Sequence, residues 1–160
     1  MKTVYVMSGV PGSGKDALAR ASAYALIKNG QKIAIIDKEN VSKLYIKHHE
    51  EYNKNELNKQ FYGKINKLLK EDWDAIFIED LNLTEKDRKD LLKVITKDWK
   101  VICISLTTKL KNCLSNNETR KDSDDYVNPS IIKTLYKQKT KPSCDEGWDD
   151  IWFMEPSGMR

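Results

Sequence analysis

Two kinds of hydrophobic pattern alternate along the chain. Short runs rich in β-branched and aromatic residues predict buried strands over residues 2–7, 32–36, 73–78, 99–106 and 148–154. Between them, apolar residues that recur every three or four positions predict helices over residues 17–28, 41–49, 57–69, 107–115 and 129–139, and a further helix that Thr84 caps. Strands that alternate with helices indicate an α/β fold, with a parallel sheet of about five strands and helices on both faces.

The first predicted strand runs directly into a glycine-rich turn, Gly9-Val10-Pro11-Gly12-Ser13-Gly14-Lys15, and a helix follows. In this context the pattern is typical of a phosphate-binding loop, because the glycines let backbone N–H groups point at a phosphate and the lysine adds positive charge. The residues predicted to hold the phosphates are Gly9, Pro11, Gly12, Ser13, Gly14, Lys15, Asp16 and Ala17. Asp16 stands where a magnesium-binding Ser or Thr is usual, and we expect its carboxylate to turn toward the metal instead.

Acidic side chains follow the next two predicted strands. Asp37 and Glu39 come after the second strand, and Asp80 comes after the third. The carboxyl ends of parallel strands meet at one rim of the sheet, so these groups should lie near the loop. A magnesium ligand and a base for an acceptor hydroxyl are what phosphoryl transfer needs there. Asp16 or Asp80 could serve the metal, and Glu39 or Asp37 could be the base; we favour Glu39.

A wholly polar segment, residues 116–125, cannot contribute to a core and predicts a mobile lid over about residues 114–128. It contains Arg120, and only four of the 28 basic residues are arginine. Because a guanidinium holds phosphate with a planar fork, we expect Arg120 to act on the transferred phosphoryl group together with Lys15.

The length and composition narrow the class of protein. A chain of 160 residues predicts one domain over 1–160, and a formal charge of +4 permits a polyanionic substrate without requiring one. We expect no leader, no membrane span and a cytoplasmic location, since no apolar run approaches the roughly 18 residues that a span needs. Three widely spaced cysteines favour reduced thiols over disulfides or a zinc site. The number of subunits stays open, and a homo-oligomer is one option.

Several motifs resemble the P-loop kinases typified by the 5′-hydroxyl polynucleotide kinase domain of phage end-repair enzymes. Gly9–Lys15 is similar to that family's Gly-Cys-Pro-Gly-Ser-Gly-Lys loop, residues 78–83 to its strand ending in Asp-Thr-Asn-Leu, and residues 117–120 to its lid. The resemblance implies a kinase that uses ATP and Mg²⁺ to phosphorylate the 5′ end of DNA or RNA. It gives Arg120 the role of the lid arginine and Asp80 the role of the acid that orders the water molecules around magnesium. It also suggests a phage gene, and hence the host cytoplasm.

Two departures keep other functions open. The family places an Asp after the second strand and an Arg three residues later, where this chain has Glu39 and Ser42. Residues 36–41 also resemble adenylylsulfate kinases, and Gly-Lys-Asp resembles phage deoxynucleoside monophosphate kinases, so the acceptor could be a small molecule. A nucleotide-binding relative without catalytic activity is the third alternative.

Overall fold

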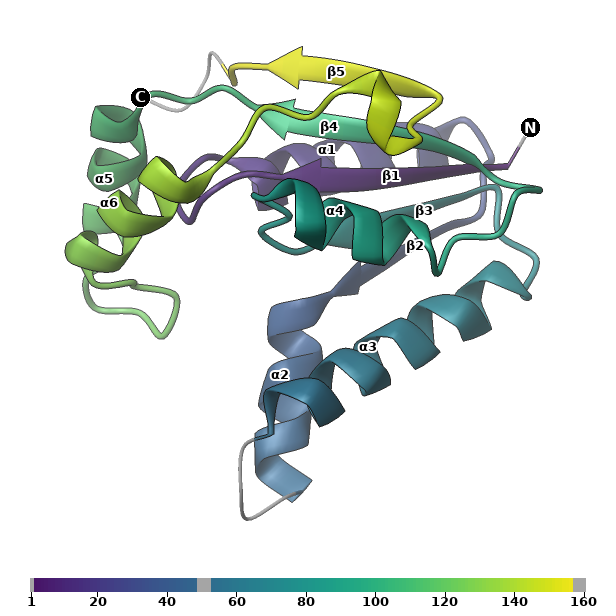
Figure 1. Cartoon of the computed structure of the whole chain (residues 1–160), viewed down its shortest axis with the longest axis horizontal. Coiled ribbons are helices and arrows are strands. Elements are labelled where there is room, and N and C mark those ends of the chain that lie inside the picture. Colours follow the sequence, from purple (N-terminus) through teal and green to yellow (C-terminus); the bar gives the residue numbers. More distant parts are fainter. Residues whose placement is uncertain (1, 49–52, 157–160) are drawn as a thin grey trace.

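A computed structural model describes residues 2–48 and 53–156. It contains a parallel sheet of five strands in the order β2-β3-β1-β4-β5 (Figure 1). The strands are β1 (Thr3–Ser8), β2 (Ile33–Asp37), β3 (Ala75–Glu79), β4 (Lys100–Leu106) and β5 (Asp150–Met154). The helices are α1 (Lys15–Lys28), α2 (Lys38–His48), α3 (Lys54–Leu69), α4 (Glu85–Leu92), α5 (Leu110–Glu118) and α6 (Pro129–Gln138), with a 3₁₀ turn at Cys144–Glu146. The predicted fold class is therefore confirmed.

Helices cover the two faces of the sheet unequally. Helix α1 packs through Ala19 and Ala23 on one face, whose strand residues include Phe77 and Ile104. The opposite face carries the larger core, to which α3 contributes Leu57, Phe61, Ile65 and Leu69. Helix α2 and the beginning of α3 form an arm that projects from the body of the protein in Figure 1, and α5 and α6 lie together at another end.

Side chains at element boundaries account for the differences from the predicted bounds. Helix α2 begins at Lys38 rather than near residue 41, because the Asp37 carboxylate accepts the Glu39 N–H at 2.9 Å and caps the helix directly after β2. The predicted end of this helix at residue 49 lies outside the described residues. Thr84 caps α4 as predicted, with its hydroxyl accepting the Asp87 N–H at 3.2 Å.

The polar segment 116–125 differs from the prediction. Helix α5 extends to Glu118, three residues beyond the predicted end, and Asn117 is buried with 1 % of its surface exposed. The Asn117 amide donates to the Val127 carbonyl at 2.6 Å and accepts the Val127 N–H at 3.0 Å. This pair of hydrogen bonds closes the base of the segment, so its first residues belong to the folded body. Mobility of the remainder stays a prediction.

Candidate active site around the phosphate-binding loop

The glycine-rich turn between β1 and α1 has the backbone conformation of a phosphate-binding loop. Gly12 and Gly14 have φ values of 84° and 95°, a region that side chains disfavour. A Cβ at Gly12 would also lie 2.3 Å from the Cys113 carbonyl oxygen. Gly14 precedes α1 and has no side chain to cap it, which leaves the N–H groups of the first helical turn available for an anion.

Hydrogen bonds from outside the loop hold its carbonyl groups. The Thr108 hydroxyl donates to the Ser13 carbonyl at 2.7 Å, and the Asn116 amide donates to the Gly12 carbonyl at 2.9 Å. On the other side, the Gly9 N–H donates to the Leu81 carbonyl at 3.0 Å. The segments that follow β4 and β3 therefore fix the loop from both sides, which orients its N–H groups before any ligand arrives.

Glu79 is a site residue that the sequence analysis did not single out. It ends β3 and lies between Met7 of β1 and Asp37 of β2 in the sheet register. It is 2 % exposed, and neither carboxylate oxygen has a hydrogen-bond partner. Burial, helped by the nearby carboxylates of Asp16 and Asp37, raises its pKa to about 7 against the opposing charges of Arg20 and Lys15.

The alternation of strand residues explains which acid faces the loop. Phe77 belongs to the core beneath α1, whereas Ile76 and Ile78 belong to the core on the opposite face. Glu79 shares the side of Phe77, and therefore the side from which α1 begins. Asp80, the residue favoured from the sequence, forms an ion pair with Lys38 at 3.2 Å. Its place beside the nucleotide stays a prediction.

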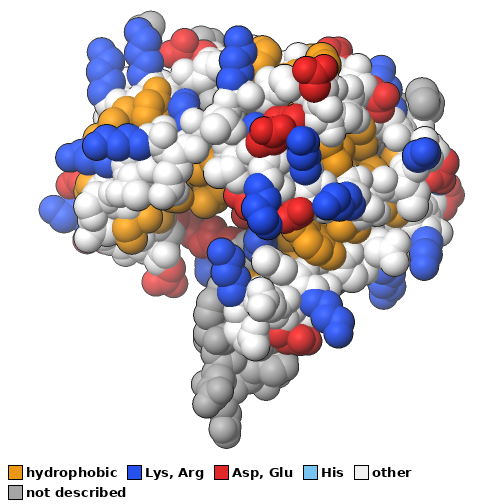
Figure 2. All heavy atoms as spheres, viewed as in Figure 1, with side chains coloured by type: hydrophobic (Ala, Val, Ile, Leu, Met, Phe, Trp, Pro, Cys, Tyr) orange, Lys and Arg blue, Asp and Glu red, His pale blue; other side chains and the backbone are white. Residues whose placement is uncertain are grey.

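A cavity of about 310 Å³ opens beside the loop and is bounded by the arm. Its lining residues are Lys15, Asp16, Asp37, Lys38, Glu39, Ser42, Leu57, Glu79, Asp80 and Leu81. The structure thus brings the predicted lysine and all four predicted carboxylates together and adds Glu79. Figure 2 shows acidic side chains in the hollow beside the arm.

The two candidate bases differ in their surroundings. Burial raises the pKa of Asp37, and its carboxylate is close enough to Asp16 and Lys15 to be affected by both charges. The Glu39 side chain is 53 % exposed and lies 3.6 Å from the Lys43 ammonium in an ion pair. Asp37 is therefore the carboxylate that the fold holds next to the loop, and Glu39 is the one at the open edge.

Arg120 does not line the cavity. It follows α5, is half-buried, and its backbone N–H donates to the Asn117 carbonyl at 2.9 Å. Among the described residues its guanidinium has no ion pair or hydrogen bond. Asn116, one helical turn earlier, is the residue of this segment that contacts the loop. A second link joins the segment to the arm, where Asp125 lies 3.8 Å from Lys43.

Two further predicted loop residues have distinct surroundings. Pro11 is half-buried and Ala17 is exposed on the first turn of α1. The Ser13 hydroxyl, in contrast, is buried without a hydrogen-bond partner. Buried polar atoms are normally paired, and both the unpaired Ser13 hydroxyl and the unpaired Glu79 carboxylate lie at the loop or in the lining of the cavity beside it.

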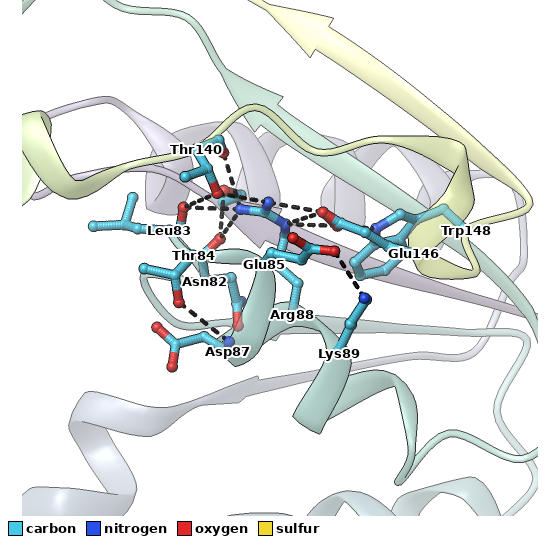
Figure 3. A network of polar contacts seen from close by, with 11 residues as sticks. Asn82, Leu83, Thr84, Glu85, Asp87, Arg88, Lys89, Thr140, Glu146 and Trp148 are labelled. Atoms are coloured by element: carbon cyan, nitrogen blue, oxygen red, sulfur yellow. Dashed lines mark hydrogen bonds and ion pairs between the residues drawn. The ribbon is translucent and has the colours of Figure 1, made fainter.

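Arg88 forms the most extensive polar network in the described structure, and no phosphate is involved (Figure 3). Its guanidinium is fully buried and donates to the Glu146 carboxylate at 2.8 Å, to the Leu83 carbonyl at 2.8 Å and to the Thr140 carbonyl at 3.0 Å. The network joins the segment after β3, which holds the loop at Gly9, to the segment after α6. This rare arginine therefore has a structural role, because Glu146, Thr140 and backbone carbonyl groups occupy its guanidinium.

We expect Arg88→Met to destabilise the protein by about 3–5 kcal/mol, because it leaves the Glu146 carboxylate buried without its partner. The double variant Arg88→Met/Glu146→Leu should recover most of this loss, since it removes both charges. Urea unfolding measures the two free energies. Equal stabilities for the single and double variants would show that the ion pair is not what the network depends on.

The Glu79 pKa predicts how stability depends on pH. Between pH 4.5 and about 7 the native state binds a proton that the unfolded state has released, so the free energy of unfolding should fall by about 1–3 kcal/mol as pH rises through this range. Glu79→Gln should abolish this component, since glutamine does not titrate. Urea unfolding of both proteins at several pH values measures the difference. Parallel pH profiles would contradict the assignment.

The fold and the sequence are similar to those of known proteins. The family model described as "Chromatin associated protein KTI12" matches residues 3–154. The structure resembles Kti12 from Chaetomium thermophilum, solved in complex with ADP-AlF3, with a TM-score of 0.68, 19 % identity, and coverage of 96 % of this chain and 89 % of that one.

Two other solved structures show the same kinase-like fold. The adenylylsulfate kinase CysC of Mycobacterium tuberculosis has a TM-score of 0.65 and 15 % identity, with 98 % of this chain and 90 % of that one covered. A chain of the Pnkp1/Rnl/Hen1 RNA repair complex has a TM-score of 0.68 and 14 % identity, with 86 % of this chain but only 43 % of that one covered. The fold is thus that of P-loop kinases, and the match over residues 3–154 shows that the chain belongs to the KTI12 family.

Proposed function

We propose that this protein is an ATP-dependent phosphotransferase, with the nucleotide in the phosphate-binding loop and the acceptor hydroxyl in the adjoining cavity. The observation that carries the proposal is the buried, unpaired Glu79 carboxylate, which lies beside Asp37 in the sheet and is affected by the charges of Asp16 and Lys15. Keeping a carboxylate without a partner in the core is costly. A cation brought by a bound nucleotide would offset that cost at this position.

The donor half of the site consists of the loop and the beginning of α1. The uncapped N–H groups after Gly14 and the Lys15 ammonium would hold the phosphates, and the positive φ values of Gly12 and Gly14 give the loop the turn that this requires. The presence of ADP-AlF3 in the Chaetomium Kti12 structure supports a nucleotide as the ligand.

The residues present fit a magnesium ion that arrives with ATP. No described group of three or more His, Cys, Asp or Glu side chains could hold a metal by itself. Magnesium in kinases takes only one or two carboxylates and otherwise binds phosphates and water, so a full protein cage is not required. Asp16 and Glu79 would hold it, with Asp80 ordering its waters. When bound, the ion would neutralise charge on the phosphates.

For the acceptor we propose the 5′-hydroxyl end of a polynucleotide. The likeness to a chain of an RNA repair complex supports it, as does the loop motif. Asp37 would accept the hydroxyl proton, because its raised pKa suits proton transfer near neutral pH better than that of an ordinary carboxylate. Glu39 is the alternative base, at the edge where the acceptor enters.

One observation favours a second candidate, transfer to a small hydroxyl compound. The cavity beside the loop is lined by five carboxylates and two lysines, a balance that repels a polyanion until metal and nucleotide are bound. Its volume of about 310 Å³ also suits a small molecule.

A parallel acceptor assay distinguishes these functions. Radiolabelled ATP is offered with a 5′-hydroxyl oligonucleotide, deoxynucleoside monophosphates, adenylylsulfate or no acceptor. We expect label on the oligonucleotide, and a loss of about a hundredfold or more in Lys15→Ala because its charge acts on the transferred group. Lys28→Ala, at the far end of α1, is the matched control.

Each other outcome of this assay has a definite meaning. Label on a small acceptor alone would establish the second candidate, and phosphate release without an acceptor would establish a hydrolase. If ADP binds, as calorimetry would show, but no label moves, the protein is a nucleotide-binding module and the proposal of catalysis fails.

Arg120→Ala should lower turnover by about a hundredfold while changing ADP affinity little, since we propose that the lid arginine contacts the phosphoryl group only during transfer. Lys121→Ala is the control, because Lys121 is a neighbouring cation whose ion pair with Glu118 is exposed. Steady-state kinetics and ADP titration separate the two effects. Unchanged turnover in Arg120→Ala would remove this residue from the site.

A further inference from the structure

A second cavity, of about 340 Å³, lies on the other side of the first loop residues. It is lined by Ser8, Gly9, Leu83, Ser105, Leu106, Thr107, Lys139, Thr140, Lys141 and Phe153. Strand alternation places Ser8, Ser105 and Phe153 on the sheet face opposite α1. The cavity shares no lining residue with the one beside the arm, although Leu106 in its lining belongs to the core beneath α1 and each cavity includes a residue of the loop.

The charge of this cavity is opposite to that of the first. Two lysines and no carboxylate line it, whereas five carboxylates line the cavity beside the arm. Among the described residues, neither Lys139 nor Lys141 forms an ion pair. Instead the Lys139 ammonium lies 3.9 Å from the centre of the Tyr136 ring, and that of Lys141 lies 5.0 Å from the centre of the Phe153 ring. Aromatic faces position both charges and leave them without a counter-ion.

Hydrogen bonds fix the backbone at Thr140, which lies between the two lysines in the sequence. The Thr140 N–H donates to the Leu83 carbonyl at 2.8 Å, while the Thr140 carbonyl and hydroxyl both accept hydrogen bonds from Arg88. The lysines therefore flank a fixed point of the buried Arg88 network (Figure 3). A site whose backbone is ordered in advance loses less entropy when a ligand binds.

The remaining lining supplies polar and apolar contacts. The Ser105 and Thr107 hydroxyls have no hydrogen-bond partner among the described residues, so each could donate to a ligand oxygen. Leu83 and Phe153 add an apolar surface. The volume lies in the range of sites for small organic ligands and exceeds what an isolated phosphate ion needs.

We propose that this second cavity binds a small phosphorylated organic molecule. Its phosphate lies between the Lys139 and Lys141 ammonium groups, its hydroxyl groups contact Ser105 and Thr107, and its carbon skeleton packs on Leu83 and Phe153. The ligand is held next to Gly9, so its occupancy stabilises the first residue of the phosphate-binding loop. The proposal does not rest on the catalytic function proposed above.

Calorimetric titration with ribose 5-phosphate, ribose and inorganic phosphate tests the site, with the loop first saturated with ADP or, if ADP does not bind, left free. We expect ribose 5-phosphate to bind more tightly than either fragment, and Lys139→Gln/Lys141→Gln to weaken binding by about tenfold or more because both attractions to the phosphate are lost. Lys133→Gln/Lys137→Gln, the same charge change on exposed positions of α6, should bind as the wild type does.

Three results would overturn the proposal. They are no binding of ribose 5-phosphate to the wild type at millimolar concentration, equal weakening in the two double variants, and equal affinity for ribose and ribose 5-phosphate. Circular dichroism spectra of both double variants are compared with that of the wild type to check that the variants fold. Lys15→Ala provides a separate check, because binding that disappears in this variant would belong to the phosphate-binding loop and not to the second cavity.

Discussion

The candidate site depends on a carboxylate that the fold buries without a partner. Glu79 ends β3 at the carboxyl edge of the parallel sheet, where its neighbours in register are Met7 and Asp37, and burial raises its pKa to about 7. Two other carboxylates, of Asp16 and Asp37, act on it in the same direction. The cluster is therefore tolerated near neutral pH because Glu79 can hold a proton, and a bound cation would let all three groups ionise together.

The loop beside this cluster is rigid because residues far apart in the sequence hold its carbonyl groups. Thr108 and Asn116 hold one side, and the segment after β3 holds Gly9 on the other. Arg88 in turn fixes the segment after β3 and the segment after α6 through one buried guanidinium. A disturbance at Arg88 would thus reach the loop through backbone hydrogen bonds, without any contact between Arg88 and a phosphate.

Much of the architecture follows from the sequence, because strand patterns, the glycine turn and the Thr84 cap are local signals. The site was only partly predictable. Side chains alternate between the two faces of a strand, so Glu79, and not Asp80, lies on the same face as Phe77. To conclude that this face is the one covered by α1, one must know where α1 packs, and no local pattern of the sequence gives that. No local pattern predicts that Arg88 and Asn117 are buried, because their partners, Glu146 and Val127, lie 58 and 10 residues away in the sequence and become neighbours only in the fold.

The two cavities give the phosphate-binding loop different electrostatic surroundings on its two sides. Acids gather where the last residues of β2 and β3 meet α1, and lysines gather where the segment after α6 crosses the ends of β1 and β4. Repulsion among the acids would favour a metal on their side, whereas lysines without an ion pair among the described residues would favour an anion on the other. Since Gly9 lies at the second cavity and Lys15 at the first, a short loop fixed by hydrogen bonds joins two cavities whose linings differ in charge.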